Sequence, residues 1–121
     1  MILVDTSIWV DHLRAGSEVL GGLLDAGRVL MHPFVAGELA LGAWPERQVF
    51  LGALGDLPCS EVATHAEVAA FIERHALFGR GVGYVDVHLL AAARLTAGCA
   101  LWTADRRLHG VADSLGVAWG G

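Results

Sequence analysis

Short, unbroken apolar runs alternate along this chain with segments of helical character, and this alternation limits the folds it can adopt. Residues 1–4 (Met-Ile-Leu-Val) are apolar at every position, which is typical of a parallel strand buried on both faces. Residues 29–31 and 99–102 follow the same pattern. Residues 59–62 and 117–119 are candidates for a short edge strand and a last strand. Because helical segments separate these runs, the sequence predicts an α/β fold with a mainly parallel sheet.

Capping residues predict where the helices begin. Thr64 and Glu67 form a Thr-x-x-Glu capping box ahead of a helix that reaches about residue 77. Pro33 fits the first turn of another helix. Thr6 or Ser7 can cap a helix through residue 13, and we favour Ser7 as the cap. The other helices are expected at residues 18–26, 46–54, 84–96 and after residue 105.

Composition limits the size and surroundings of the molecule. With 121 residues the chain is expected to form one domain, residues 1–121. It is 55% hydrophobic and only 17% charged, so either a partner or second copy covers part of its apolar surface, or an Ala- and Gly-rich core absorbs it. Cys59 and Cys99 lack the spacing of a zinc site and are expected to be reduced. With no signal peptide or membrane span in the sequence, a cytoplasmic location is expected.

The charge balance argues against one class of function. The formal net charge is −5, which gives no overall basic field for passive nucleic-acid binding. It argues less strongly against a metal-dependent nuclease, since bound cations add positive charge at the site. All eight basic residues are arginines, which suit bidentate contacts to phosphate.

Four acidic residues lie in or beside apolar segments where a carboxylate is costly: Asp5, Glu38, Asp86 and Asp105. Lysine is absent from the chain, and none of the four acids has an arginine three or four residues away. A divalent cation is therefore the expected partner of these carboxylates. Four carboxylates converging on a hard metal ion suit phosphodiester chemistry.

The predicted elements allow the four acids to meet. Asp5 directly follows the first strand and Asp105 follows the 99–102 strand, so both reach one edge of the sheet if these strands are neighbours. Glu38 and Asp86 are expected in the first turns of helices that start from that edge. Taken singly, Asp5 or Asp105 could instead cap a helix, and Glu38 or Asp86 could face solvent.

Four short motifs carry a resemblance to a known family. They are residues 3–9 (Leu-Val-Asp-Thr-Ser-Ile-Trp), 37–39 (Gly-Glu-Leu), 85–92 (Val-Asp-Val-His-Leu-Leu-Ala-Ala) and 101–105 (Leu-Trp-Thr-Ala-Asp). In order and spacing they resemble the acidic motifs of PIN domains, and most closely those of VapC toxins. The resemblance implies a three-layer α/β/α sandwich, endoribonuclease activity with Mg²⁺ or substituting Mn²⁺, homodimerisation, and inhibition by a VapB-type antitoxin.

The resemblance also implies roles for individual residues. The catalytic and metal-binding acids would be Asp5, Glu38, Asp86 and Asp105, supported by Thr6 and Thr103 beside the metal. His88 is expected to face away from the site and to be structural. The candidates for contacts to RNA phosphates are Arg14, Arg80, Arg106 and Arg107.

The expected reaction is in-line attack of a metal-activated water on phosphorus. The resemblance implies that this reaction leaves 5′-phosphate and 3′-hydroxyl ends. A response-receiver domain would need a lysine, which the chain lacks. A haloacid-dehalogenase-like phosphatase would need Asp-x-Asp at the first strand, and residues 5–7 (Asp-Thr-Ser) do not provide it. A catalytically silent or regulatory binding domain with an acidic metal pocket stays open. The RNA target, the number of metal ions and the antitoxin stay undetermined.

Overall fold

A computed structural model of the chain describes residues 1–120. Its centre is a parallel sheet of three short strands in the order β2-β1-β3. They are β1 (Ile2–Val4), β2 (Val29–Leu30) and β3 (Ala100–Trp102). Two single bridges extend the sheet, from Met31 to Cys59 and from Leu101 to Ala118. The expected strands at residues 59–62 and 117–119 are thus reduced to one paired residue each.

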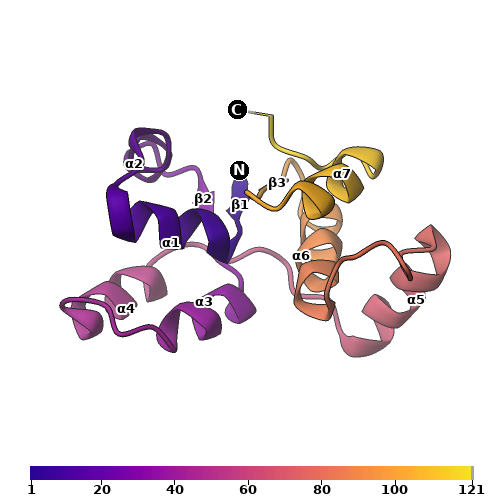
Figure 1. Ribbon diagram of the computed structural model, residues 1–121, viewed down its shortest axis with the longest axis horizontal. Helices are drawn as coiled ribbons and strands as arrows, with labels where there is room; N and C mark the ends of the chain where they lie inside the picture. Colours follow the sequence, from indigo (N-terminus) through magenta and orange to yellow (C-terminus); the bar gives the residue numbers. More distant parts are fainter. Residues whose placement is uncertain (121) are drawn as a thin grey trace.

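Seven helices surround the described sheet: α1 (Thr6–Ala15), α2 (Glu18–Asp25), α3 (Pro33–Ala40), α4 (Arg47–Gly55), α5 (His65–His75), α6 (Tyr84–Leu95) and α7 (Arg106–Ser114). In the view of Figure 1, α1 to α4 are drawn to the left of β1 and α5 to α7 to the right of it. The predicted capping box at Thr64 and Glu67 is present at the start of α5. No helix within residues 1–120 is both long and apolar enough to cross a membrane.

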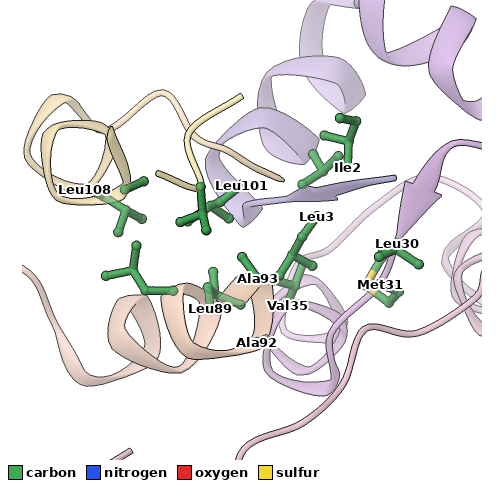
Figure 2. Packing of buried hydrophobic residues seen from close by; sticks show 14 of the residues in the cluster. Ile2, Leu3, Leu30, Met31, Val35, Leu89, Ala92, Ala93, Leu101 and Leu108 are labelled. Carbon is green, nitrogen blue, oxygen red and sulfur yellow. The ribbon is translucent and has the colours of Figure 1, made fainter. Parts of the chain in front are cut away.

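The central strand is buried on both faces, as its unbroken apolar run predicted. Ile2, Leu3 and Val4 are at most 3% exposed. In Figure 2, Leu3 points toward Val35 of α3 and Ala93 of α6, whereas Ile2 points to the opposite face. Successive strand residues face opposite sides, so helices must cover both faces. The fold is the predicted three-layer α/β sandwich.

Candidate active site

The carboxyl ends of β1 and β3 bring two of the acids to one edge of the sheet. Val4 pairs with Trp102 in the parallel register, and the backbone N–H of Asp5 donates to the Trp102 carbonyl at 2.9 Å. Asp5 therefore leaves the sheet beside the segment that leads to Asp105. Each acid is also the N-cap of the helix that follows it, α1 and α7. The capping role and the shared location, which the sequence presented as alternatives, occur together.

Asp5 is the most constrained carboxylate of the site. It is 8% exposed, and its Oδ1 accepts a hydrogen bond from the backbone N–H of Thr6 at 2.7 Å. Its Oδ2 accepts from the Ser7 hydroxyl at 2.9 Å and from the Thr103 hydroxyl at 2.7 Å. Three donors on one carboxylate fix its orientation.

Ser7 is not the cap of the first helix, so that prediction is wrong. The helix begins one residue earlier, at Thr6, and Asp5 takes the cap position because its carboxylate reaches the Thr6 N–H. The Ser7 hydroxyl instead donates to Asp5 and accepts from the backbone N–H of Ala104 at 3.2 Å. It joins two segments 97 residues apart. The hydroxyl two residues after Asp5 was the only sequence signal for this role.

Glu38 enters the site from the second turn of α3, not from its first turn as expected. Its Oε1 accepts a hydrogen bond from the Thr6 hydroxyl at 2.7 Å. Because Thr6 follows Asp5 directly, this bond ties the third helix to the end of the first strand. The hydroxyls of Thr6 and Thr103 thus donate to the side chains of Glu38 and Asp5; their expected place beside a metal ion stays a prediction.

Asp86 is the third residue of α6 and completes the group. Its Oδ2 accepts a hydrogen bond from the backbone N–H of Gly83 at 2.9 Å, which caps the helix. Burial raises its pKa above the ordinary value, the Gly83 hydrogen bond opposes this, and the negative charges of Asp5, Asp105 and Glu38 raise it further. All four acids are therefore close enough to interact electrostatically.

The donor set fits a hard divalent cation, although the side chains are not arranged as a finished ligand shell. Within the described residues, no three carboxyl groups lie close enough together to ligate one ion as they stand. Asp86 and Asp105 are turned toward the first turns of their own helices, and Glu38 toward Thr6. Carboxylate oxygens are the ligands that Mg²⁺ and Mn²⁺ prefer, so the chemistry of the site suits these ions.

One of the four candidate arginines packs against the loop that leads to Asp86. The side chain of Arg107, in the first turn of α7, packs against Gly81 in the loop before α6. A Cβ added at Gly81 would lie 2.8 Å from the Arg107 Cδ and Nη1 atoms. Arg106 shares this first turn, and Arg80 lies in the loop itself. Arg14 is in the last turn of α1, about 13 Å along the helix axis from Asp5, so the fold does not bring it to the acids.

His88 lies one turn beyond Tyr84 on α6 and is 4% exposed. Burial, and then the nearby His65, lower its pKa. Within the described chain neither of its ring nitrogens has a hydrogen-bond partner. Its ring packs against those of Phe34 and Tyr84, each at a centroid distance of 4.6 Å. It does not join the carboxylates, in line with the expected structural role.

A parallel sheet between helices, with acidic side chains at the carboxyl ends of its strands, defines the class of protein. The family model of the PIN domain matches residues 2–114, and the chain belongs to this family. Over 118 residues it is 46% identical to "Ribonuclease VapC32" of Mycobacterium tuberculosis, in each of two strains. The match covers 98% of this chain and 95% of that protein. The resemblance to VapC-type PIN domains is thereby confirmed.

Proposed function

We propose that this chain is a metal-dependent endoribonuclease that acts on RNA in the cytoplasm as the toxin of a VapBC-type toxin–antitoxin pair. The relative at 46% identity is named as a ribonuclease of the VapC series, and similarity over nearly the full length of both chains supports the same activity here. The observation that carries the proposal is the acidic site at the carboxyl ends of β1 and β3, where the Thr103 hydroxyl joins Asp5 to Asp105 and the Thr6 hydroxyl joins this strand end to Glu38.

The residues that would hold Mg²⁺, or Mn²⁺ in its place, are Asp5, Glu38, Asp86 and Asp105. A bound divalent cation would supply Lewis-acid chemistry, activating water and stabilising charge at phosphorus. The chain orients this donor set: Ser7 and Thr103 fix the carboxylate of Asp5, and Thr6 fixes that of Glu38. Hydrolysis would leave 5′-phosphate and 3′-hydroxyl ends. The Arg107 side chain, with Arg80 and Arg106 nearby, would contact phosphates that flank the cleaved bond.

The proposed partners are a second copy of the chain and a VapB-type antitoxin. Several apolar side chains are exposed in the single chain, including Leu41 at 88% and Val49 at 71%. Such side chains favour association with other protein surfaces. Light scattering at micromolar concentration should give a dimer, and co-expression with a neighbouring antitoxin gene should give a stable complex. A monomer that binds no such product would contradict both assignments.

Cleavage of RNA by the purified protein tests the activity. The wild type should cleave a fluorescent single-stranded RNA in Mg²⁺ or Mn²⁺ but not in EDTA. Asp86→Asn should abolish cleavage while leaving the protein folded, because it removes one of the four carboxylates of the site. Asp11→Asn is the matched control, since this exposed aspartate lies farther along α1. Metal binding without any cleavage by the wild type would instead identify a catalytically silent binding domain.

A further inference from the structure

A hollow of about 430 Å³ lies between α5 and the C-terminal part of α6. Two of the residues that line it, Ala63 and Ala91, are buried, and their side chains end at Cβ, so space remains above them. Phe71 and Leu95 add apolar surface, and Leu95 is 49% exposed. None of the four acids lines this hollow, and Leu95 lies about 13 Å along the helix axis from Asp86. The hollow is therefore separate from the acidic site.

The charges that line the hollow have the opposite sign to the charge of the molecule. Arg74 and Arg94 line it together with one acid, Glu67, which gives a formal charge of +1 when His75 is counted as neutral. The whole chain carries −5. The Glu67 carboxylate is already engaged at the start of α5, where its Oε1 accepts a hydrogen bond from the backbone N–H of Thr64 at 2.9 Å. The charge of the hollow therefore favours an anionic ligand.

Contacts with neighbouring groups hold parts of this lining in place. The Nη1 of Arg94 donates to the Leu115 carbonyl at 2.9 Å, which fixes the guanidinium between α6 and α7. An arginine has five N–H donors, so this hydrogen bond leaves others for a ligand. On α5, the ring of His75 packs against that of Phe71 at a centroid distance of 4.7 Å. Side chains that are ordered before binding lose less conformational entropy when a ligand binds.

A second hollow of similar size shows what the charges add. It lies between α3 and α4 and has a volume of about 410 Å³. Among the described residues that line it none is charged, and Ala36, Ala40, Leu51 and Leu54 are typical of the lining. That hollow suits any apolar group. Of the two, the hollow between α5 and α6 is the one that selects a ligand with negative charge beside an apolar group.

We propose that the hollow between α5 and α6 binds an acidic peptide segment of a partner protein, in which an apolar side chain lies between aspartates or glutamates. The apolar side chain would rest on Ala63 and Ala91, and the carboxylates would pair with Arg74 and Arg94. An RNA strand would satisfy the arginines through its phosphates but would leave the apolar lining uncovered. This inference goes beyond the proposed nuclease and does not depend on it.

Fluorescence anisotropy at low ionic strength tests the proposal with three labelled peptides, Gly-Asp-Glu-X-Glu-Asp-Gly, where X is Leu, Ile or Phe. Analogues with Asn and Gln in place of the acids are the control ligands. The wild type should bind at least one acidic peptide on the order of tenfold more tightly than its analogue. Arg74→Gln should weaken this binding about fivefold, because it removes one exposed ion pair. Arg28→Gln is the matched control, since this exposed arginine does not line the hollow.

A second variant fills the hollow without changing its charge. Ala70 is exposed and lines the hollow, so Ala70→Trp should abolish binding of the acidic peptides. Ala69→Trp is its matched control, because Ala69 is also exposed on α5 but does not line the hollow. RNA cleavage should be the same in both tryptophan variants. If Ala70→Trp does not fold, Arg74→Gln carries the test, since it changes an exposed side chain.

Acidic peptides that bind no more tightly than their amide analogues overturn the proposal, and so does a folded Ala70→Trp variant that binds them like wild type. Loss of RNA binding in Ala70→Trp and Arg74→Gln, with peptide binding unchanged, would assign the hollow to RNA and overturn it. Variants that turn a dimer into a monomer would assign it to a contact between copies, with the same consequence. A wild type that binds the peptides but cleaves no RNA overturns the proposed function and upholds this inference.

Discussion

At the scale of single residues, hydroxyl groups fix the acidic side chains of the site. Thr103 is 8% exposed and links two acids: its hydroxyl donates to the Oδ2 of Asp5 and accepts from the backbone N–H of Asp105 at 3.1 Å. Ser7 makes an equivalent link from the other strand end through Ala104. The carboxylate of Asp5 is therefore held by groups that cannot turn away without losing two hydrogen bonds each.

Replacing Thr103 by valine should damage both stability and cleavage. Valine has nearly the same shape but lacks the hydroxyl, so Asp5 loses a donor and the Asp105 N–H loses its acceptor. We expect the free energy of unfolding to fall by about 1–3 kcal/mol, measured by urea denaturation. Initial rates of RNA cleavage should fall more than the folded fraction does. Thr103→Ser keeps the hydroxyl and should behave nearly like wild type; equal rates in Thr103→Val would contradict this role.

His32 predicts how stability depends on pH. It is fully buried and caps α3 by accepting the backbone N–H of Phe34 on Nδ1 at 3.0 Å. Burial, and then the nearby His88, lower its pKa from 6.5 to about 4. As the pH falls, His32 of the unfolded chain therefore takes up a proton near pH 6.5, whereas His32 of the folded chain stays neutral until about pH 4. The stability that the folded chain gains while His32 is neutral is fully present above pH 6.5, and it is lost as the pH falls toward 4.

In this pH range the free energy of unfolding should fall by about 1.4 kcal/mol per pH unit, and by on the order of 3 kcal/mol in total. His32→Asn keeps an acceptor at the cap but does not titrate. We therefore expect the difference in unfolding free energy between wild type and variant to shrink as the pH is lowered through this window. Urea denaturation at several pH values measures it, and a difference that stays constant with pH would show that His32 is not the titrating group.

At the scale of elements, the Arg107 side chain joins the start of α7 to the loop before α6. Gly79 and Gly81 both have positive φ, at 71° and 77°, where an L-residue is strained. They differ in their surroundings: Arg107 lies over Gly81, while the space beside Gly79 is empty to 4 Å. The absence of a Cβ at Gly81 therefore leaves room for the Arg107 side chain beside this loop.

Gly81→Ala should displace Arg107, because a flexible side chain yields more easily than the backbone. Gly79→Ala pays a similar conformational penalty of about 1 kcal/mol without touching the arginine, so it is the matched control. We expect weaker RNA binding in Gly81→Ala and Arg107→Ala but not in Gly79→Ala. The Arg107→Ala variant should also lower the salt slope of binding by about 0.7, since it removes one phosphate contact.

The double variant Gly81→Ala/Arg107→Ala should bind no more weakly than Arg107→Ala alone, since both changes remove the same contact. Additive losses would mean that Gly81 acts through the loop and not through the arginine. Far-ultraviolet circular dichroism on all variants would confirm that α6 and α7 are intact.

At the scale of the whole molecule, the acidic site concentrates negative charge in a chain whose net charge is already −5. The charges of Asp5, Asp105 and Glu38 all act on Asp86, and their repulsion opposes folding unless a cation neutralises it. Metal binding and folding stability should therefore be linked.

Divalent metal should raise the melting temperature. A ligand that binds only the folded state at about 100 times its dissociation constant contributes roughly 2.7 kcal/mol. For a chain of this length that corresponds to a shift on the order of 5–10 °C. Asp105→Asn should remove much of the shift in Mn²⁺ but change little in EDTA, because asparagine still caps α7 and one repelling charge is gone. Identical melting of the wild type in Mn²⁺ and EDTA would contradict a metal site in the free protein.

The sequence by itself determined the features that depend on near neighbours. Unbroken apolar runs located β1, β2 and β3, and the Thr64 capping box located α5, because burial and capping act within a few residues. The four acids stood out for a local reason too: each is a costly charge in or beside an apolar segment. Even here the order of residues 5–7 left the cap ambiguous, since three adjacent oxygen-bearing side chains could fill it.

Only the tertiary structure decided what joins these segments. The Ser7 hydroxyl meets Ala104, Thr6 meets Glu38, and the Arg107 side chain fills the space beside Gly81. These contacts depend on β1 and β3 being neighbours and on how far each helix runs before it meets another. Propensity and periodicity describe a chain only over a turn or a strand, so pairings 32 or 97 residues apart leave no trace in them. They are set by the packing of the helices on the sheet.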